Sequence, residues 1–173
     1  EFHGQRVHFI GIGGSGMCGL AEMLTQMGAI VSGSDRTSSS ITAKLSGQGI
    51  KISYQQTAEA FPPDARHVVY SAAIRADHPE LCEAQRAGVK VFKYARMLGE
   101  VMAIKHGIAI AGTHGKSTTT SLLAYILLRA GMDPSYIIGA SSRQLGGSAH
   151  GGTGDYFIAE ACEFDRSFFE SPS

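Results

Sequence analysis

The stretch RVHFIGIGGSGMCGLAEMLTQMG, residues 6–28, decides the fold. It begins with an apolar run typical of a buried strand and passes through a glycine-rich turn. It continues with apolar residues at helical spacing as far as Gly28, which is a typical helix stop. Gly11, Gly13 and Gly16 give the pattern G-x-G-x-x-G between strand and helix. This order is typical of a dinucleotide-binding α/β domain.

The same alternation continues along the first hundred residues. Short apolar runs alternate with helical stretches, which indicates βαβ units, a parallel sheet and helices on both of its faces. We therefore expect a Rossmann-like α/β domain over residues 1–103. Its predicted strands are 6–12, 29–35, 50–53, 67–73 and 89–94, and its predicted helices are 15–28, 38–49, 78–88 and 95–103.

The pattern then restarts with HGIAIAGTHGKSTTTSLLAYILLRAGMDP, residues 106–134. This is again a strand, a glycine turn and a helix that ends at a glycine. Further strands are predicted at 136–140 and 156–161, and the glycine-rich segment 141–155 between them is predicted to be a mobile surface loop. Residues 104–173 are thus expected to form the truncated start of a P-loop ATPase-like α/β domain.

Composition and charge narrow the function classes. The 173 residues carry 15 Lys+Arg and 15 Asp+Glu, so no global field attracts nucleic acid. No apolar run approaches the length of a membrane span, and the first residues lack the shape of a signal peptide. We therefore expect a cytoplasmic protein without a nucleic-acid or membrane partner. Cys18, Cys82 and Cys162 are expected to be reduced thiols.

The first glycine turn predicts a bound diphosphate. Glycine lets the backbone turn tightly and lets a diphosphate approach the free N–H groups at a helix N-terminus. Asp35 stands 19 positions after Gly16, where such folds place an acid against ribose hydroxyls. The alternative is a tight turn without a ligand. Strand, turn, helix and Asp35 together favour a nucleotide, of which NAD(P) is the generic first candidate.

The second glycine loop predicts a triphosphate site. In GTHGKST, Gly112 and Gly115 open the loop, Lys116 reaches outer phosphates, and Ser117 and Thr118 offer hydroxyls, with Ser117 suited to Mg²⁺. The common phosphate-loop pattern has a glycine where Ile110 stands, so this loop is shorter. A helix start that contains Gly-Lys-Ser by chance is the weaker alternative.

An acidic segment follows the last predicted strand. Glu160 is the candidate second ligand of Mg²⁺, with Glu163 and Asp165 nearby. Three solvated acids in a loop are an equally good interpretation of the spacing.

The two loops together resemble the Mur ligases of peptidoglycan synthesis, and within that family the members that act on UDP-N-acetylmuramate and L-alanine. The resemblance rests on HFIGIGGSGM (8–17), GSD (33–35), YSAAIRADHPE (70–80), GTHGKSTTT (112–120) and EACEFD (160–165). Ser117 stands where the family usually has threonine, and Cys162 and Phe164 replace an aspartate and a serine.

The resemblance implies an ATP- and Mg²⁺-dependent ligase of cell wall biogenesis, with roles in cell shape and cell division, that forms an amide bond through an acyl phosphate. It implies that the first domain binds the UDP-sugar and the second binds ATP. The implied UDP-sugar residues are Gly11, Gly13, Gly14, Ser15, Gly16, Met17, Ser34, Asp35, Arg36, Ser71, Ile74 and His78. The implied ATP residues are Gly112, Thr113, His114, Gly115, Lys116, Ser117 and Thr118, with Lys116 catalytic and with Ser117 and Glu160 on the metal.

Three alternatives remain beside this one. The first is a relative that joins a whole peptide to UDP-N-acetylmuramate, which usually has a first turn with fewer glycines. The second is an NAD(P)-dependent dehydrogenase domain, which has no use for the second loop. The third is a non-catalytic binding module. Since the rest of the ATP domain and the amino-acid domain are expected to be absent, we expect no ligase activity from these 173 residues alone.

Overall fold

The computed structural model describes residues 2–160, which divide into two compact units with the break between Tyr94 and Ala95. The predicted boundary at 103/104 follows helix α4 (Tyr94–Met102), whereas the break comes at the start of that helix. Strand β5 (Lys90–Lys93) runs into α4 without a glycine or proline between them, so no sequence signal marks a break there.

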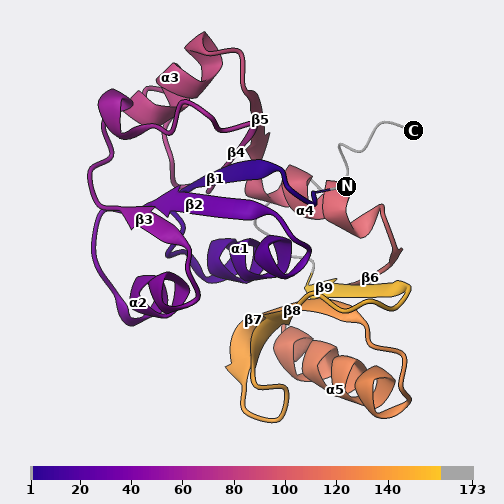
Figure 1. Cartoon of the computed structure of the whole chain (residues 1–173). Coiled ribbons are helices and arrows are strands. Elements are labelled where there is room, and N and C mark those ends of the chain that lie inside the picture. Colours follow the sequence, from indigo (N-terminus) through magenta and orange to yellow (C-terminus); the bar gives the residue numbers. More distant parts are fainter. Residues whose placement is uncertain (1, 161–173) are drawn as a thin grey trace. The chain divides into compact units, whose positions relative to one another are not determined.

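The first unit is built on a five-stranded sheet in the order β3-β2-β1-β4-β5, and all four pairings are parallel. This confirms the predicted Rossmann-like parallel sheet. Because every strand runs the same way, the carboxyl ends of all five meet at one edge (Figure 1). The strands are β1 (Arg6–Ile10), β2 (Ile30–Ser34), β3 (Lys51–Ser53), β4 (His67–Tyr70) and β5.

Three helices and one 3-10 turn connect these strands. Figure 1 shows α1 (Ser15–Gln26) and α2 (Ser40–Gly47) on one face of the sheet and α3 (Pro79–Arg86) on the other, as predicted for right-handed crossovers. Ser39 begins α2 with a reciprocal capping box. The 3-10 turn spans Ala58–Ala60. The core under α3 joins residues from the sheet, the helix and the preceding loop: Ile10, Phe61, Ala65, Val68, Leu81 and Ala84.

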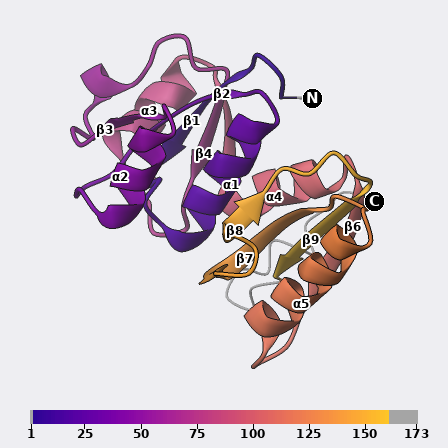
Figure 2. The ribbon, with the colours of Figure 1, turned by 60° about the horizontal axis from the view of Figure 1, so that its bottom comes forward.

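The second unit has a four-stranded sheet in the order β6-β9-β7-β8. The β6–β9 and β7–β9 pairings are parallel, and β7–β8 is antiparallel. Figure 2 shows α5 (Lys116–Arg129) against this sheet, where Ala124 packs with Tyr136, Ile138 and Ile158. The strands are β6 (His106–Ile110), β7 (Ser135–Ser142), β8 (Gly147–His150) and β9 (Tyr156–Glu160).

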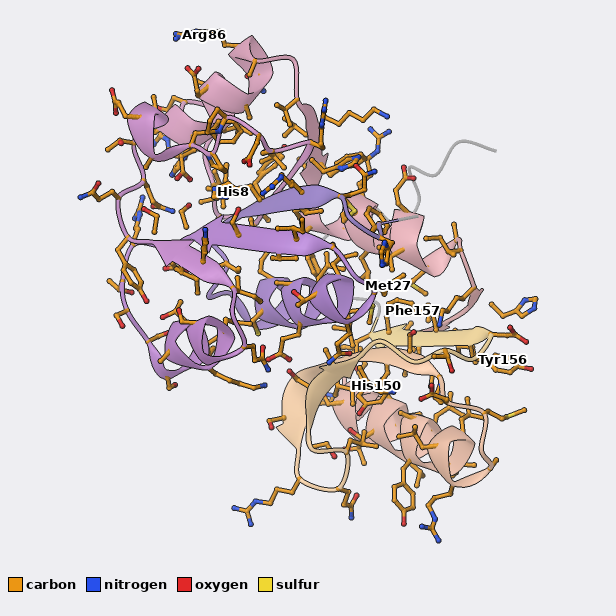
Figure 3. The ribbon with its side chains drawn as sticks, in the orientation of Figure 1. His8, Met27, Arg86, His150, Tyr156 and Phe157 are labelled. Atoms are coloured by element: carbon orange, nitrogen blue, oxygen red, sulfur yellow. The ribbon has the colours of Figure 1, made fainter. Side chains whose placement is uncertain are left out.

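Strand β8 corrects the prediction that residues 141–155 form a mobile loop. The sequence GSAH lacks the β-branched and aromatic residues that are typical of strands, so its composition does not indicate a strand. Side chains outside the strand hold it in place. Asp133, at φ 38°, bonds the ring of His150 at 2.8 Å and the amide of Thr153 at 2.7 Å. Figure 3 labels His150 at this position.

A lysine ties the start of the second sheet together. The Lys105 ammonium donates to the Ser135 hydroxyl at 2.9 Å, to the Gly154 carbonyl at 2.8 Å and to the Gly152 carbonyl. Burial lowers the pKa of Lys105, and the carboxylates of Asp133 and Asp155 oppose that effect. The loop before β9 is thereby fixed to the start of β7.

Candidate functional site

The first glycine turn lies at the carboxyl end of β1. Gly11 has φ 80°, a conformation that glycine adopts without strain, and Gly14 caps α1. The amides of Gly11 and Ile12 donate to the Ser34 carbonyl at 2.9 and 3.0 Å, which ties the turn to the end of β2. The first amides of α1, from Ser15 onward, have no acceptor within the helix and so form a ready anion site.

Asp35 lies directly against this turn. Its Oδ2 accepts the Gly13 amide proton at 2.7 Å, and its Oδ1 accepts that of Thr37 at 3.4 Å. A Cβ atom on Gly13 would lie 2.7 Å from the same Oδ2, so only glycine allows this approach. Arg36 follows on the exposed surface. One carboxylate oxygen therefore shapes the turn, and the other is only weakly engaged.

The loop after β4 closes the turn from the opposite side. A Cβ atom on Gly11 would meet the Ser71 hydroxyl at 3.2 Å and the Ile74 side chain at 3.6 Å. His78 caps α3, and its Nδ1 is buried without a hydrogen-bond partner among the described residues. Residues from three separate motifs of the sequence are thus gathered at one edge of the sheet.

Two predicted ligand residues face the interior. The Ser34 side chain is fully buried and donates to Glu80 Oε2 at 2.5 Å, while Gln56 donates to Ser34 at 3.4 Å. Met17 is 3% exposed, so its side chain belongs to the core. Ser34 and Met17 therefore support the turn from beneath it.

Sequence reasoning missed the polar cluster beneath the turn. Glu80 is fully buried, its Oε1 has no hydrogen-bond partner among the described residues, and its Oε2 lies 3.8 Å from Nε2 of buried His8. His8, which is labelled in Figure 3, has its Nδ1 2.9 Å from the Ser32 hydroxyl. The only sequence signal was Glu80 itself, two positions after His78. An acid at that position is typical of a solvated first turn of a helix, so it did not indicate a buried group.

Tyr94 is a second neighbour of the turn that the sequence did not indicate. A Cβ atom on Gly16 would lie 2.8 Å from the Tyr94 ring and hydroxyl. The third glycine of the pattern is therefore required for this packing, in agreement with the role of close approach at that position.

Cys18 lies on the same helix as Gly16, α1. Burial, and then the Glu22 carboxylate, raise the pKa of the Cys18 thiol, so the thiol stays protonated.

The second glycine loop follows β6 at the carboxyl edge of the second sheet. Gly112 has φ 145°, and Gly115, the N-cap of α5, has φ 76°, so both positions favour glycine. Thr113, His114 and Thr118 are exposed, and Lys116 and Ser117 are half-buried. The free amides at the start of α5 and the exposed loop fit a phosphate chain.

Lys116 folds back over its own loop. Its ammonium donates to the Gly112 carbonyl, and its backbone carbonyl accepts the hydroxyl of buried Thr120 at 2.9 Å. The second contact fixes the first turn of α5 and the backbone position of the lysine. The ammonium is held within the loop, where a phosphate oxygen would displace the carbonyl.

Glu160 ends β9, and it pairs with Ile110 at the end of β6, so it lies at the same sheet edge as the glycine loop. Its Oε1 accepts the Gly139 amide proton at 2.8 Å. A carboxylate with one oxygen fixed in this way is oriented as a metal ligand would be. Glu163, Asp165 and Cys162 lie outside the described residues. Within residues 2–160, no three His, Cys, Asp or Glu side chains group as a metal site.

Fold and site define a class before any comparison. Each unit carries a glycine turn at the carboxyl edge of a sheet whose central strands are parallel, which is the usual ligand position in open α/β sheets. These features are typical of α/β proteins that bind phosphate groups at glycine turns. Among residues 2–160, no helix is long and apolar enough to cross a bilayer.

Comparison with known proteins gives the family. Residues 6–106 match the model of the Mur ligase family, catalytic domain. Curated relatives include UDP-N-acetylmuramate--L-alanine ligases from Aromatoleum aromaticum, 48% identical over 95% of this chain, and Laribacter hongkongensis, 49% identical over 95%. The chain spans only about a third of their length, 35% in each case. This chain belongs to the Mur ligase family.

Solved structures agree with this assignment. The UDP-N-acetylmuramate-alanine ligase of Thermotoga maritima superimposes with a TM-score of 0.81 at 28% identity, over 90% of this chain and 37% of that one. The UDP-N-acetylmuramate:L-alanyl-gamma-D-glutamyl-meso-diaminopimelate ligase of Neisseria meningitides gives 0.83 at 29%, over 94% and 54%. The fold is thus common to ligases with different amine substrates.

Proposed function

We propose that these residues belong to an ATP-dependent ligase that joins L-alanine to UDP-N-acetylmuramate. The observation that supports this most is the 48–49% identity, over 95% of the chain, to relatives that carry that name. Such a reaction needs two phosphate-binding turns, one for the diphosphate of the sugar substrate and one for ATP. This proposal explains why one chain carries both, and it places the protein in the cytoplasm.

In the first unit, the proposed ligand of the glycine turn is the diphosphate of UDP-N-acetylmuramate. The free amides at the start of α1 would hold its oxygens, and the positive end of the helix dipole would offset part of their charge. Asp35 Oδ1, the less engaged oxygen, would face the uridine ribose, with Arg36 beside it. Ser71 and Ile74, which lie against Gly11, and His78, which caps α3, are the proposed contacts of the sugar.

In the second unit, the proposed ligand of the loop from Gly112 to Thr118 is the triphosphate of ATP. ATP supplies the phosphoryl group that activates the muramyl carboxylate as an acyl phosphate, so that the amine of L-alanine can displace phosphate. Lys116 would neutralise charge on the transferred group, and positioning with charge neutralisation is most of what such a step requires. Ser117 and Glu160 would hold Mg²⁺ from two neighbouring elements, α5 and β9.

Membership of the Mur ligase family weighs against the dehydrogenase hypothesis. The second loop weighs against it as well, since it would have no role in hydride transfer. The peptide-joining relative is a closer alternative, since its solved structures superimpose as well as that of the alanine ligase. The curated relatives at 46–49% identity favour L-alanine.

Calorimetric titration of the 173-residue chain tests the first site. We expect saturable binding of UDP-N-acetylmuramate and no binding of NADH. Binding of NADH alone would overturn the proposal. Asp35→Asn should weaken UDP-sugar binding, because it removes the charge that holds the Gly13 amide, whereas Glu59→Gln, at an exposed acid in the 3-10 turn, should not.

The chain alone should not complete the reaction. We expect no ADP release that depends on both UDP-N-acetylmuramate and L-alanine, because the chain covers only 35% of the relatives' length. A coupled assay for ADP measures this directly, and turnover above the no-enzyme rate would contradict the expectation.

A further inference from the structure

One cavity of the first unit lies away from the glycine turn. It has a volume of about 770 Å³, within the range of small-molecule sites. Its walls are the segments that lead into β1, β4 and β5, so it opens at the amino edge of the parallel sheet. Val7, His67 and Lys90 stand side by side in the register there. The glycine turn occupies the opposite, carboxyl edge.

The cavity wall carries an excess of positive charge. Arg6, Arg66 and Lys90 line it, with Asp64 as its single acid. Asp64 is bonded to Arg6 at 3.0 Å. For Arg66 and Lys90, no carboxylate of residues 2–160 lies within 4.0 Å. Because the chain as a whole has zero net charge, the excess of positive charge in this cavity is local and does not reflect a basic protein.

His67 adds a polar atom without a partner. Its Nδ1 is buried and makes no hydrogen bond to any described residue. The ring is fixed between Phe2, at a centroid distance of 6.1 Å, and Phe92, at 5.9 Å. Burial, and then the charge of Lys90, lower the pKa of His67, so the ring in the cavity wall is neutral. His67 thus lies in the cavity wall beside Lys90 in the sheet register, where its ring senses charge that enters the cavity.

One feature of the wall opposes an anion. Helix α3 ends at Arg86, so its carbonyl end and Ala87 face the same cavity. The dipole at a helix C-terminus amounts to roughly −0.5 elementary charge. Arg66 and Lys90 bring two full positive charges, so the balance still favours an anion, and the helix carbonyls can accept hydrogen bonds from a ligand hydroxyl.

We propose that this cavity is a second anion site that binds a phosphate-bearing small molecule, with Arg66 and Lys90 neutralising the charge and the His67 ring in the wall beside them. The shared chemistry is a di- or polyphosphate, whether inorganic or part of a nucleotide. The site does not depend on the proposed ligase function, since its residues lie at the other edge of the sheet from that function's residues.

The test uses the 173-residue chain with pyrophosphate and ADP as probes. The ring protons of His67, followed by NMR, report this cavity specifically, whereas anions at the glycine turns leave them unmoved. We expect a saturable displacement of the His67 signals and an increase in the pKa of His67, because a bound anion favours the protonated ring. A shift with both probes indicates the phosphate chain alone, and a shift with ADP alone indicates a nucleotide.

A matched pair of variants tests the cation. Lys90 and Lys51 are both exposed lysines and both first residues of strands in the same sheet, but only Lys90 lines the cavity. Lys90→Gln should weaken pyrophosphate binding by roughly tenfold, as expected for one charge-assisted hydrogen bond, and Lys51→Gln should leave it within about twofold. Equal effects from the two variants, or no movement of the His67 signals in the wild-type chain, would overturn the proposal.

Discussion

Replacing Ser34 by alanine tests whether the buried cluster beneath the glycine turn supports the first unit. Ser34 donates the only hydrogen bond that a described residue makes to the buried Glu80 carboxylate, at 2.5 Å. A hydrogen bond to a charged group contributes about 1.5–3 kcal/mol, and its loss leaves a buried carboxylate without a partner. We expect Ser34→Ala to lower the free energy of unfolding of the first unit by about 2–3 kcal/mol.

Ser32→Ala is the matched control for that variant. Ser32 lies on the same strand, is half-buried, and bonds the ring of His8 rather than a carboxylate. Its loss should cost about 1 kcal/mol or less. Urea denaturation, followed through NMR signals of the first unit alone, separates this unit from the second. With a slope of about 1–3 kcal/mol per molar urea, Ser34→Ala should lower the midpoint by about 1 M.

A double-mutant cycle with Glu80→Gln completes the test. Glutamine removes the charge that Ser34 satisfies, so Ser34→Ala should cost less in that background, with a coupling of about 1 kcal/mol or more. Additive effects, or a Ser34→Ala loss no larger than that of Ser32→Ala, would refute the reasoning.

Three further predictions concern other contacts. Gly13→Ala should weaken UDP-N-acetylmuramate binding by calorimetry, because its methyl would lie 2.7 Å from Asp35 Oδ2, whereas Gly47→Ala, with open space around it, should leave binding unchanged. Hydrogen bonds from Thr153 and His150 lower the pKa of Asp133 from 3.8 to about 2. Its stabilisation, about 1 kcal/mol after discounting for exposure, should be present above pH 3.8 and lost as pH falls through about 2, and acid titration of Asp133→Asn should lack that phase. Lys105→Met should lower the thermal midpoint of the second unit by several degrees, because three oxygens lose their donor.

Regular periodicity made most of the fold predictable. Strong alternation of strand and helix around Gly11 and Gly115 gave both glycine turns and the parallel pairing of the first sheet. Strand β8 escaped prediction because its four small or polar residues carry no strand signal, and its position depends on Asp133, which is distant in sequence. Local pattern is silent about such partners.

The candidate site was predictable as a set of motifs and less so as a set of contacts. The sequence predicted Gly13 and Asp35 for one site, but it could not show that they bond each other or that the Ser34 hydroxyl points inward to Glu80. In a parallel sheet covered by helices on both faces, the residues of both faces are buried. The sequence of such a strand therefore does not show which face a polar side chain points to. Tyr94 was missed for the related reason that only packing brings it to Gly16.

The bond between the Lys116 ammonium and the Gly112 carbonyl makes the affinity of the second loop depend on how many charged oxygens a ligand carries. An anion that enters must first release that bond, so a ligand with one or two charged oxygens exchanges one contact for another at little net gain. A triphosphate, as we propose for this loop, recovers the loss several times over through the amides at the start of α5. In a cell rich in inorganic phosphate, such a self-occupied lysine would keep the loop vacant for the ligand that carries the most charge.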